Sequence, residues 1–209
     1  MNRKTAAYLT PYREAVEKFG TGFDATLWST PEAQQRRFAV LADMLPMQGR
    51  TVVDAGCGPG DLAVFLRRKR IRFKRYIGID GVEKIVHAAA ARKLPKCEFR
   101  QADLVRHAGI IGEYEPDVVV FSGTLNTMTE QTARTLLGHA FDVAQVGVVF
   151  NFLSNRPHPR FREQKLGPAK RFNTIRMLDW ALSQSPWVSF RQDYFDGHDA
   201  AIAITKKRD

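Results

Sequence analysis

Residues 52–62 read VVDAGCGPGDL, and this stretch decides the expected fold. A short β-rich run, residues 51–55, ends in three glycines at alternate positions, Gly56, Gly58 and Gly60, and a helical pattern follows over residues 62–66. Glycines in such a turn let backbone amides approach a ligand closely, because no Cβ intervenes. The amino terminus of the next helix favours anionic or hydrogen-bond-accepting groups. The stretch therefore predicts a strand, a ligand-binding loop and a helix in succession.

The glycine spacing separates this loop from the G-x-G-x-x-G loop of dinucleotide-binding folds. The third glycine of that pattern would fall at position 61, which is Asp61. A carboxylate at this position is poor for close packing of helix on strand and would repel a pyrophosphate. A nicotinamide-dependent oxidoreductase is therefore the less favoured alternative.

Outward from this loop, helical and strand-like segments alternate. Two helices lead, from Thr10 to Gly20 and from Thr30 to Leu45, and a strand–helix unit then repeats five times. The expected strands are residues 51–55, 76–79, 98–101, 117–121 and 147–152. The expected helices between and after them are residues 62–66, 82–92, a short one starting near His107, 129–145 and 173–183. A final strand pair, residues 187–195 and 199–205, surrounds the Asp196-Gly197 turn. This order predicts an α/β fold with a largely parallel sheet.

Two acidic residues follow the next two strands. Asp80 ends the second strand, 20 residues after Gly60, where a carboxylate can accept hydrogen bonds from both ribose hydroxyls. Asp103 ends the third strand, in a position to meet an adenine amino group. The glycine loop and these two spaced acids together point to an adenosine-containing ligand.

This pattern resembles the class I S-adenosylmethionine-dependent methyltransferases over about residues 50–205. The resemblance implies a three-layer, Rossmann-like α/β sheet, mostly parallel with an antiparallel C-terminal hairpin. It also implies one domain over residues 1–209, with a helical cap (1–48) and a cofactor-binding core (49–209). The cofactor would be S-adenosylmethionine (SAM), and the product S-adenosylhomocysteine (SAH). The implied cofactor residues of the core are Asp54, Ala55, Gly56, Cys57, Gly58, Gly60, Asp80, Gly81, Asp103, Leu104 and Ser122.

The cap resembles the N-terminal helices that lie across the cofactor in a smaller subset of the family. We expect Arg37, or its neighbour Arg36, to pair with the cofactor carboxylate, because a guanidinium suits a planar bidentate partner. Tyr12 and Trp28 would cover the methionine part, where a sulfonium gains cation–π attraction. Packing alone is the alternative role of both aromatic residues.

Methyl transfer depends mainly on orientation of the nucleophile, with a base where a proton must leave. In such a sheet the substrate lies beyond the carboxyl ends of the strands. His158 and His198 are the candidate bases there, and Tyr194 is a candidate positioning residue. Their alternative is an ordinary loop role. No metal-ligand spacing occurs in the sequence, so we expect no metal.

Composition leaves the acceptor open. The 209 residues are 44% hydrophobic and 26% charged, and the formal net charge of +10 favours an anionic partner. Residues 67–75 hold seven basic side chains in nine, and residues 154–171 form a second basic stretch. A small-molecule acceptor is slightly favoured, with RNA or protein methylation and a non-catalytic SAM-binding subunit as alternatives. Two cysteines, no secretory signal and no membrane-spanning run predict a cytoplasmic protein without membrane contact.

Overall fold

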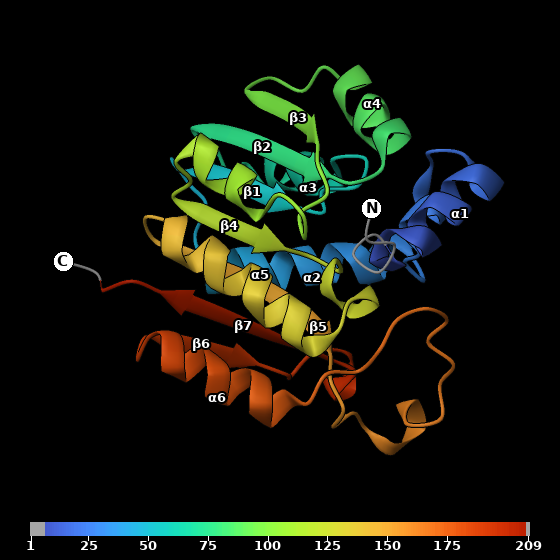
Figure 1. The fold of residues 1–209 in the computed structure, drawn as a ribbon, viewed down its shortest axis with the longest axis vertical. Coiled ribbons are helices and arrows are strands. Elements are labelled where there is room, and N and C mark those ends of the chain that lie inside the picture. Colours follow the sequence, from blue (N-terminus) through green and yellow to red (C-terminus); the bar gives the residue numbers. More distant parts are fainter. Residues whose placement is uncertain (1–6, 208–209) are drawn as a thin grey trace.

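The computed structural model describes residues 7–207, which build one seven-stranded sheet with helices on both faces (Figure 1). The strands are β1 (Thr51–Ala55), β2 (Arg75–Asp80), β3 (Cys97–Gln101), β4 (Val118–Phe121), β5 (Gly147–Leu153), β6 (Val188–Arg191) and β7 (Asp199–Thr205). Their order in the sheet is β3-β2-β1-β4-β5-β7-β6. Only β7 runs against its neighbours β5 and β6, and the pairs among β1 to β5 are parallel. The α/β class and the mostly parallel sheet expected from the sequence are confirmed.

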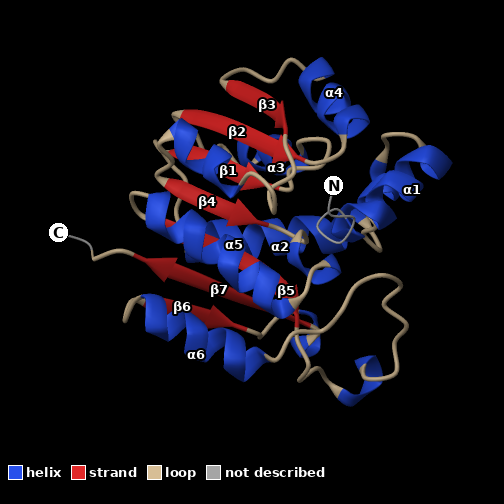
Figure 2. Cartoon of the chain, in the orientation of Figure 1, coloured by secondary structure: helices blue, strands red, loops and turns tan. Residues whose placement is uncertain are grey.

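Figure 2 distinguishes the helices from the strands by colour; along the chain, two helices come first and each strand from β1 to β5 is then followed by a helix or a 3₁₀ turn. The α-helices are α1 (Thr10–Phe19), α2 (Pro31–Met44), α3 (Asp61–Arg68), α4 (Glu83–Ala91), α5 (Glu130–Val143) and α6 (Thr174–Gln184). Short 3₁₀ turns are η2 (Phe23–Thr26), η3 (Ala108–Tyr114), η4 (Leu125–Thr127), η5 (Pro159–Phe161) and η6 (Phe195–Gly197). Thr30 caps α2 by accepting a hydrogen bond from the Ala33 amide, as its sequence position indicated.

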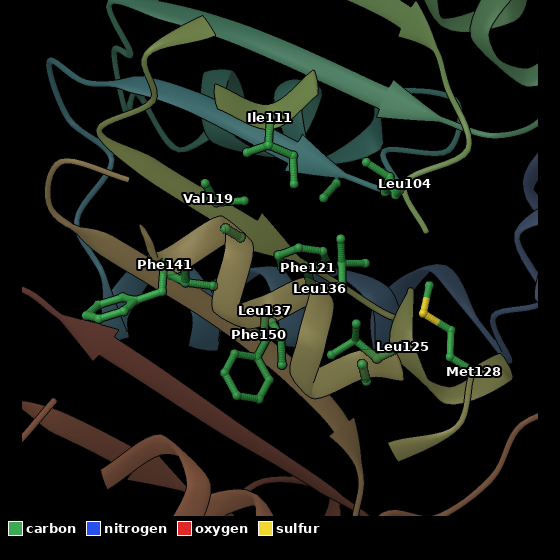
Figure 3. Close-up of a cluster of buried hydrophobic side chains, with 14 of the residues drawn as sticks. Leu104, Ile111, Val119, Phe121, Leu125, Met128, Leu136, Leu137, Phe141 and Phe150 are labelled. Atoms are coloured by element: carbon green, nitrogen blue, oxygen red, sulfur yellow. The ribbon is translucent and has the colours of Figure 1, made fainter. Parts of the chain in front are cut away.

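Strand β4 shows why the sheet is covered on both faces. Its side chains are all buried, and alternate residues enter different cores. Val119 and Phe121 pack under α5 with Leu136 and Phe150, in the cluster drawn in Figure 3. Val118 and Val120 face the other core, which includes apolar side chains of α2 and α3. A run of β-branched residues without a polar side is typical of such a central parallel strand.

Two elements differ from the sequence expectation. The connection between β3 and β4 forms η3 instead of an α-helix, because Gly109 and Gly112 both disfavour helical continuation. Strand β6 ends at Arg191 instead of residue 195, because Phe195 and Asp196 take left-handed backbone angles (φ 50° and 48°). Residues 192–198 therefore form a compact connection built around η6.

The carboxyl ends of the parallel strands face the N-terminal elements. In Figure 1 the arrowheads of β2, β3 and β4 point towards α1, and the long β5–α6 connection, drawn in orange, lies on the same side. Among residues 7–207, no helix has the length and apolar character needed to cross a membrane.

Candidate functional site: two adjoining pockets

The glycine loop after β1 forms the floor of a pocket. Gly56, Gly58 and Gly60 all have left-handed backbone angles (φ 82°, 52° and 82°). A Cβ at Gly56 would collide with the Thr124 side chain, and one at Gly60 would come within 2.9 Å of the Phe99 ring. A Cβ at Gly58 would meet no atom within 4 Å, so this glycine leaves open space in the pocket. Two glycines thus allow packing, and the middle one keeps the backbone accessible to a ligand.

Asp80 stands at the end of β2 beside this loop. One carboxylate oxygen accepts a hydrogen bond from the Gly58 amide (3.0 Å) and the other from the Val82 amide (2.9 Å). Burial raises the pKa of Asp80, while these amides act in the opposite direction. A carboxylate has about four acceptor positions, so both oxygens can still accept a hydrogen bond from a ligand hydroxyl.

Two buried oxygens in this pocket are without a partner among the described residues. They are Oδ1 of Asp54 and Oγ of Ser122. The other Asp54 oxygen accepts a hydrogen bond from the Tyr76 hydroxyl, and burial raises the pKa of Asp54 to about 7. Orphaned buried polar atoms are rare in folded proteins. These two oxygens, with the open glycine loop, fit a polar ligand that supplies the missing hydrogen-bond donors.

Aromatic side chains of the N-terminal segment cover the pocket. Tyr8, Tyr12 and Trp28 line it together with the glycine loop. The Tyr12 hydroxyl donates to the Gly123 carbonyl (3.3 Å), and the Tyr8 hydroxyl donates to Asp103 (2.8 Å). The cap is thereby tied to the loops after β4 and β3.

A second pocket lies directly beside the first. The two share Tyr12, Thr26, Trp28 and Gly123 as a common wall. The second pocket is further lined by polar residues of the strand ends and by the β5–α6 connection, namely Asn126, Asn151, His198, Asp199 and residues 164–169.

The chain was compared with known proteins. Residues 52–147 match a protein family described as a methyltransferase domain. The matched segment is a methyltransferase domain. The match covers most of β1, the glycine loop and Asp80, and it confirms the methyltransferase resemblance. Methyltransferases with bound SAM or SAH among the similar structures support SAM as the cofactor. The family match supports this interpretation over the oxidoreductase alternative.

Individual relatives agree with this assignment. The chain is 33% identical over 107 residues to a trans-aconitate 2-methyltransferase from Delftia acidovorans, an alignment covering 51% of this chain and 38% of that protein. It therefore spans well under half the length of this curated relative. An O-methyltransferase family protein from Burkholderia thailandensis is similar with a TM-score of 0.70 and 18% identity, over 96% of this chain and 63% of that one. The magnesium protoporphyrin IX methyltransferase of Synechocystis with bound SAH has a TM-score of 0.64 and 16% identity, over 98% and 97%. At these identities the structural similarities establish the fold.

The structure brings most of the expected cofactor residues of the methyltransferase domain into the first pocket. Those lining it are Tyr12, Trp28, Asp54, Gly56, Cys57, Gly58, Asp80, Gly81, Leu104 and Ser122. Ala55 and Gly60 belong to the strand end and the helix start that hold the loop. Asp103 lines a neighbouring hollow, where the Tyr8 hydroxyl and the Val105 amide occupy one of its oxygens.

Arg37 has a different partner from the one expected. Its buried guanidinium forms a bidentate ion pair with Asp199 through Nε and Nη2, the latter at 2.7 Å. It lies between the rings of Trp28 and Phe195, 4.7 and 4.6 Å from their centroids. The fork that was expected to hold a cofactor carboxylate is thus engaged within the protein. Asn151 also donates to Asp199 (3.0 Å) and accepts from the Gly123 amide (2.9 Å).

The three candidate catalytic residues fall in different surroundings. His198 lines the second pocket. His158 is exposed and accepts a long hydrogen bond from the Arg160 amide (3.4 Å) at the start of η5, outside both pockets. Tyr194 is only 2% exposed, packs in the core with α2 and β7, and lines neither pocket. The geometry therefore leaves His198 as the candidate that can touch an acceptor.

Several pocket residues were not expected from the sequence. Gln34 and Phe38 occupy successive turns of α2 and reach the cofactor pocket, and Thr124 follows β4 beneath Gly56. Their i, i+4 spacing on α2 was an available signal for the first two. Within residues 7–207, no cluster of three or more histidine, cysteine or acidic side chains could hold a metal ion.

Proposed function

We propose that this chain transfers the methyl group of SAM to a small molecule bound in the second pocket. The single observation that carries the proposal is the shared wall of the two pockets, formed by Tyr12, Thr26, Trp28 and Gly123. An acceptor in the second pocket lies next to a cofactor in the first, without an intervening layer of core. Holding the two reactants together in the right orientation is a large contribution that a protein makes to such a transfer.

The chain's own residues have distinct tasks in this function. Gly58, Asp54, Asp80 and Ser122 line the first pocket and would hold the cofactor, which supplies an electrophilic methyl group when bound. Trp28 and Tyr12 close the pocket from the cap side and exclude water from the reaction. The curated relative's name gives trans-aconitate as its acceptor, and this supports a small-molecule acceptor here.

Thermal denaturation with SAM, SAH, NAD and NADP tests the cofactor and the class of activity together. A ligand at 100 times its dissociation constant adds about 2.7 kcal/mol of stability. For a domain of this size that amounts to a rise of about 5–10 °C in Tm. We expect this rise with SAM and SAH alone. Transfer of labelled methyl groups into the small-molecule fraction of a cell extract then tests the acceptor class, and labelling confined to macromolecules would contradict the proposal.

An RNA acceptor is the second candidate, and one observation favours it. Six exposed basic side chains gather at the end of α3 and before β2; we call them the basic foot. They are Arg67, Arg68, Lys69, Arg70, Arg72 and Lys74. No ion pair with an acidic side chain occurs for them within residues 7–207. The basic foot lies at the amino ends of the strands, away from both pockets, so it would anchor RNA without guiding it to the site.

A further inference from the structure

His198 is held in one orientation by an arginine. Its Nδ1 lies 3.2 Å from Nη2 of Arg171. A guanidinium can only donate hydrogen bonds, so Nδ1 must accept, and the proton of the neutral ring must reside on Nε2. Burial lowers the pKa of His198, which favours this neutral ring. His198 therefore presents an N–H group, and not a lone pair, at Nε2.

Other hydrogen bonds hold the guanidinium of Arg171 in place beside Nδ1. Its Nη1 donates to the Ser154 carbonyl (2.8 Å), and its Nη2 donates to the Phe161 carbonyl (2.8 Å). The Phe161 ring also packs on the imidazole, with the ring centroids 4.8 Å apart. On the other side, Nε2 is 4.0 Å from Oδ1 of Asp199, which is too long for a hydrogen bond. The Nε2–H group is therefore available to a ligand in the second pocket.

The other titratable residues lining this pocket do not offer a base. Both oxygens of Asp199 accept hydrogen bonds from Arg37, and one also accepts from Asn151. The Tyr12 hydroxyl donates to the Gly123 carbonyl, and burial raises its pKa to about 12. Arg37 is a cationic donor whose charge is matched by Asp199, and Lys165 is a cationic donor with no such partner among residues 7–207. The described residues lining the pocket thus supply donors and positive charge.

We propose that the methyl acceptor is a carboxylate, bound through the Nε2–H of His198, with His198 as a hydrogen-bond donor and not a general base. This inference rests on the proposed methyl transfer. A carboxylate is already an anion at neutral pH, so its methylation requires no base. One oxygen lone pair forms the new bond to the methyl carbon while the carbon–sulfur bond breaks, and that electron pair stays on sulfur. The products are a methyl ester and SAH, and no proton is transferred.

The charge around the pocket fits an anionic acceptor. Arg156, Arg162, Lys165 and Lys170 lie in the β5–α6 connection, and none of them forms an ion pair within residues 7–207. Arg160 of the same connection pairs with Asp196. The connection thus carries unneutralised positive charge beside the pocket, which attracts small anions.

Nitrogen-15 NMR of the histidine side chains tests the donor role independently of turnover. At pH 7 we expect His198 to show the neutral ring protonated on Nε2, and we expect Arg171→Ala to abolish this fixed tautomer. His158→Ala serves as the control, because His158 lies outside the pocket and its removal should leave the His198 signals unchanged. A His198 ring protonated on Nδ1 would overturn the proposal.

Two substitutions of His198 separate a donor from a base. Gln at this position retains an amide N–H near the location of Nε2 but cannot act as a base, whereas Leu offers neither group. We expect His198→Gln to lose less than tenfold in kcat/KM and His198→Leu to lose far more. A general base contributes about 10²–10⁴-fold, so equal losses of that size in both variants would contradict the donor role.

The acceptor class is tested with SAH-bound protein and with labelled SAM. In the presence of SAH, small di- and tricarboxylic acids should raise Tm in the wild type but not in His198→Leu, and the corresponding amides should not. Label transferred from SAM should be released as volatile methanol by mild alkali, as a methyl ester requires. Alkali-stable label, or no stabilisation by any acid, overturns the carboxylate proposal. Absence of stabilisation by SAH itself would instead refute the proposed function.

Discussion

The buried ion pair between Arg37 and Asp199 yields the sharpest prediction of stability. Arg37→Met retains the aliphatic bulk of the side chain and removes its charge. Asp199, which is fully buried, is then left with Asn151 as its remaining donor. Breaking a buried pair by removing one partner costs about 3–5 kcal/mol. At about 2–4 °C per kcal/mol, the expected fall in Tm is about 6–20 °C.

Urea denaturation at 25 °C measures this loss, and two further variants identify its cause. Arg36 neighbours Arg37 on α2 but is exposed, so Arg36→Met should change the free energy of unfolding by less than about 0.5 kcal/mol. The double variant Arg37→Met/Asp199→Asn removes the stranded carboxylate charge and should recover part of the loss. The two single substitutions should therefore be non-additive, as expected for residues in contact.

Binding data provide the refutation. If Arg37 instead held the cofactor carboxylate, Arg37→Met would leave the urea midpoint unchanged and weaken SAH binding strongly while adenosine binding stayed the same. That combination of results would show that the guanidinium serves the ligand and not Asp199.

Three further predictions concern the pockets and the basic foot. The raised pKa of Asp54, about 7 against 3.8, means that the folded state binds an extra proton, so stability falls as pH rises from about 4 to 7. At 1.36 kcal/mol per pH unit this loss amounts to about 4 kcal/mol, and Asp54→Asn removes it. Without ligand, the variant should therefore be more stable in urea than the wild type at pH 8 but not at pH 4. Gly123→Ala forces a Cβ against the Trp28 ring at a left-handed position (φ 71°), and we expect at least tenfold weaker SAH binding by calorimetry, with unchanged affinity contradicting the shared wall. If the basic foot binds RNA, replacing Arg67, Arg68, Arg70 and Arg72 by Gln should reduce the salt dependence of single-stranded RNA binding by roughly 0.7 per lost phosphate contact, measured by fluorescence anisotropy.

The parts of the fold that the sequence predicted are those determined by local pattern. The glycine loop follows from three glycines between a β-branched run and a helix, all within eleven residues. The position of Asp80 beside the loop could be predicted because Asp80 ends the next parallel strand, and such strand ends meet at one edge of a sheet. The helix α2 could be predicted from Thr30 and Pro31 at its start and from an apolar pattern of helical period.

The parts that the sequence did not predict depend on contacts between distant residues. Asp199 lies 162 residues from Arg37. The sequence placed it correctly at the start of the last strand, where it begins β7 opposite Leu153, but it gave no sign of the partner that its carboxylate would meet. Arg171 could not be linked to His198 before the β5–α6 connection was placed beside η6. A residue type states which hydrogen bonds are possible, but the tertiary structure decides which partner takes them.

These long-range contacts also connect the two pockets. Arg37 stacks on Trp28, which forms part of their shared wall, and pairs with Asp199. Asp199 accepts from Asn151, whose own oxygen holds the amide of Gly123 in the same wall. The cap, the end of β4, β5 and β7 are therefore joined through one buried polar network. Because a buried network tolerates few alternative arrangements, it fixes the wall that the two pockets share. A sequence that buries an ion pair here accepts its desolvation cost, and the gain is a rigid shared wall that fixes the position of one pocket relative to the other.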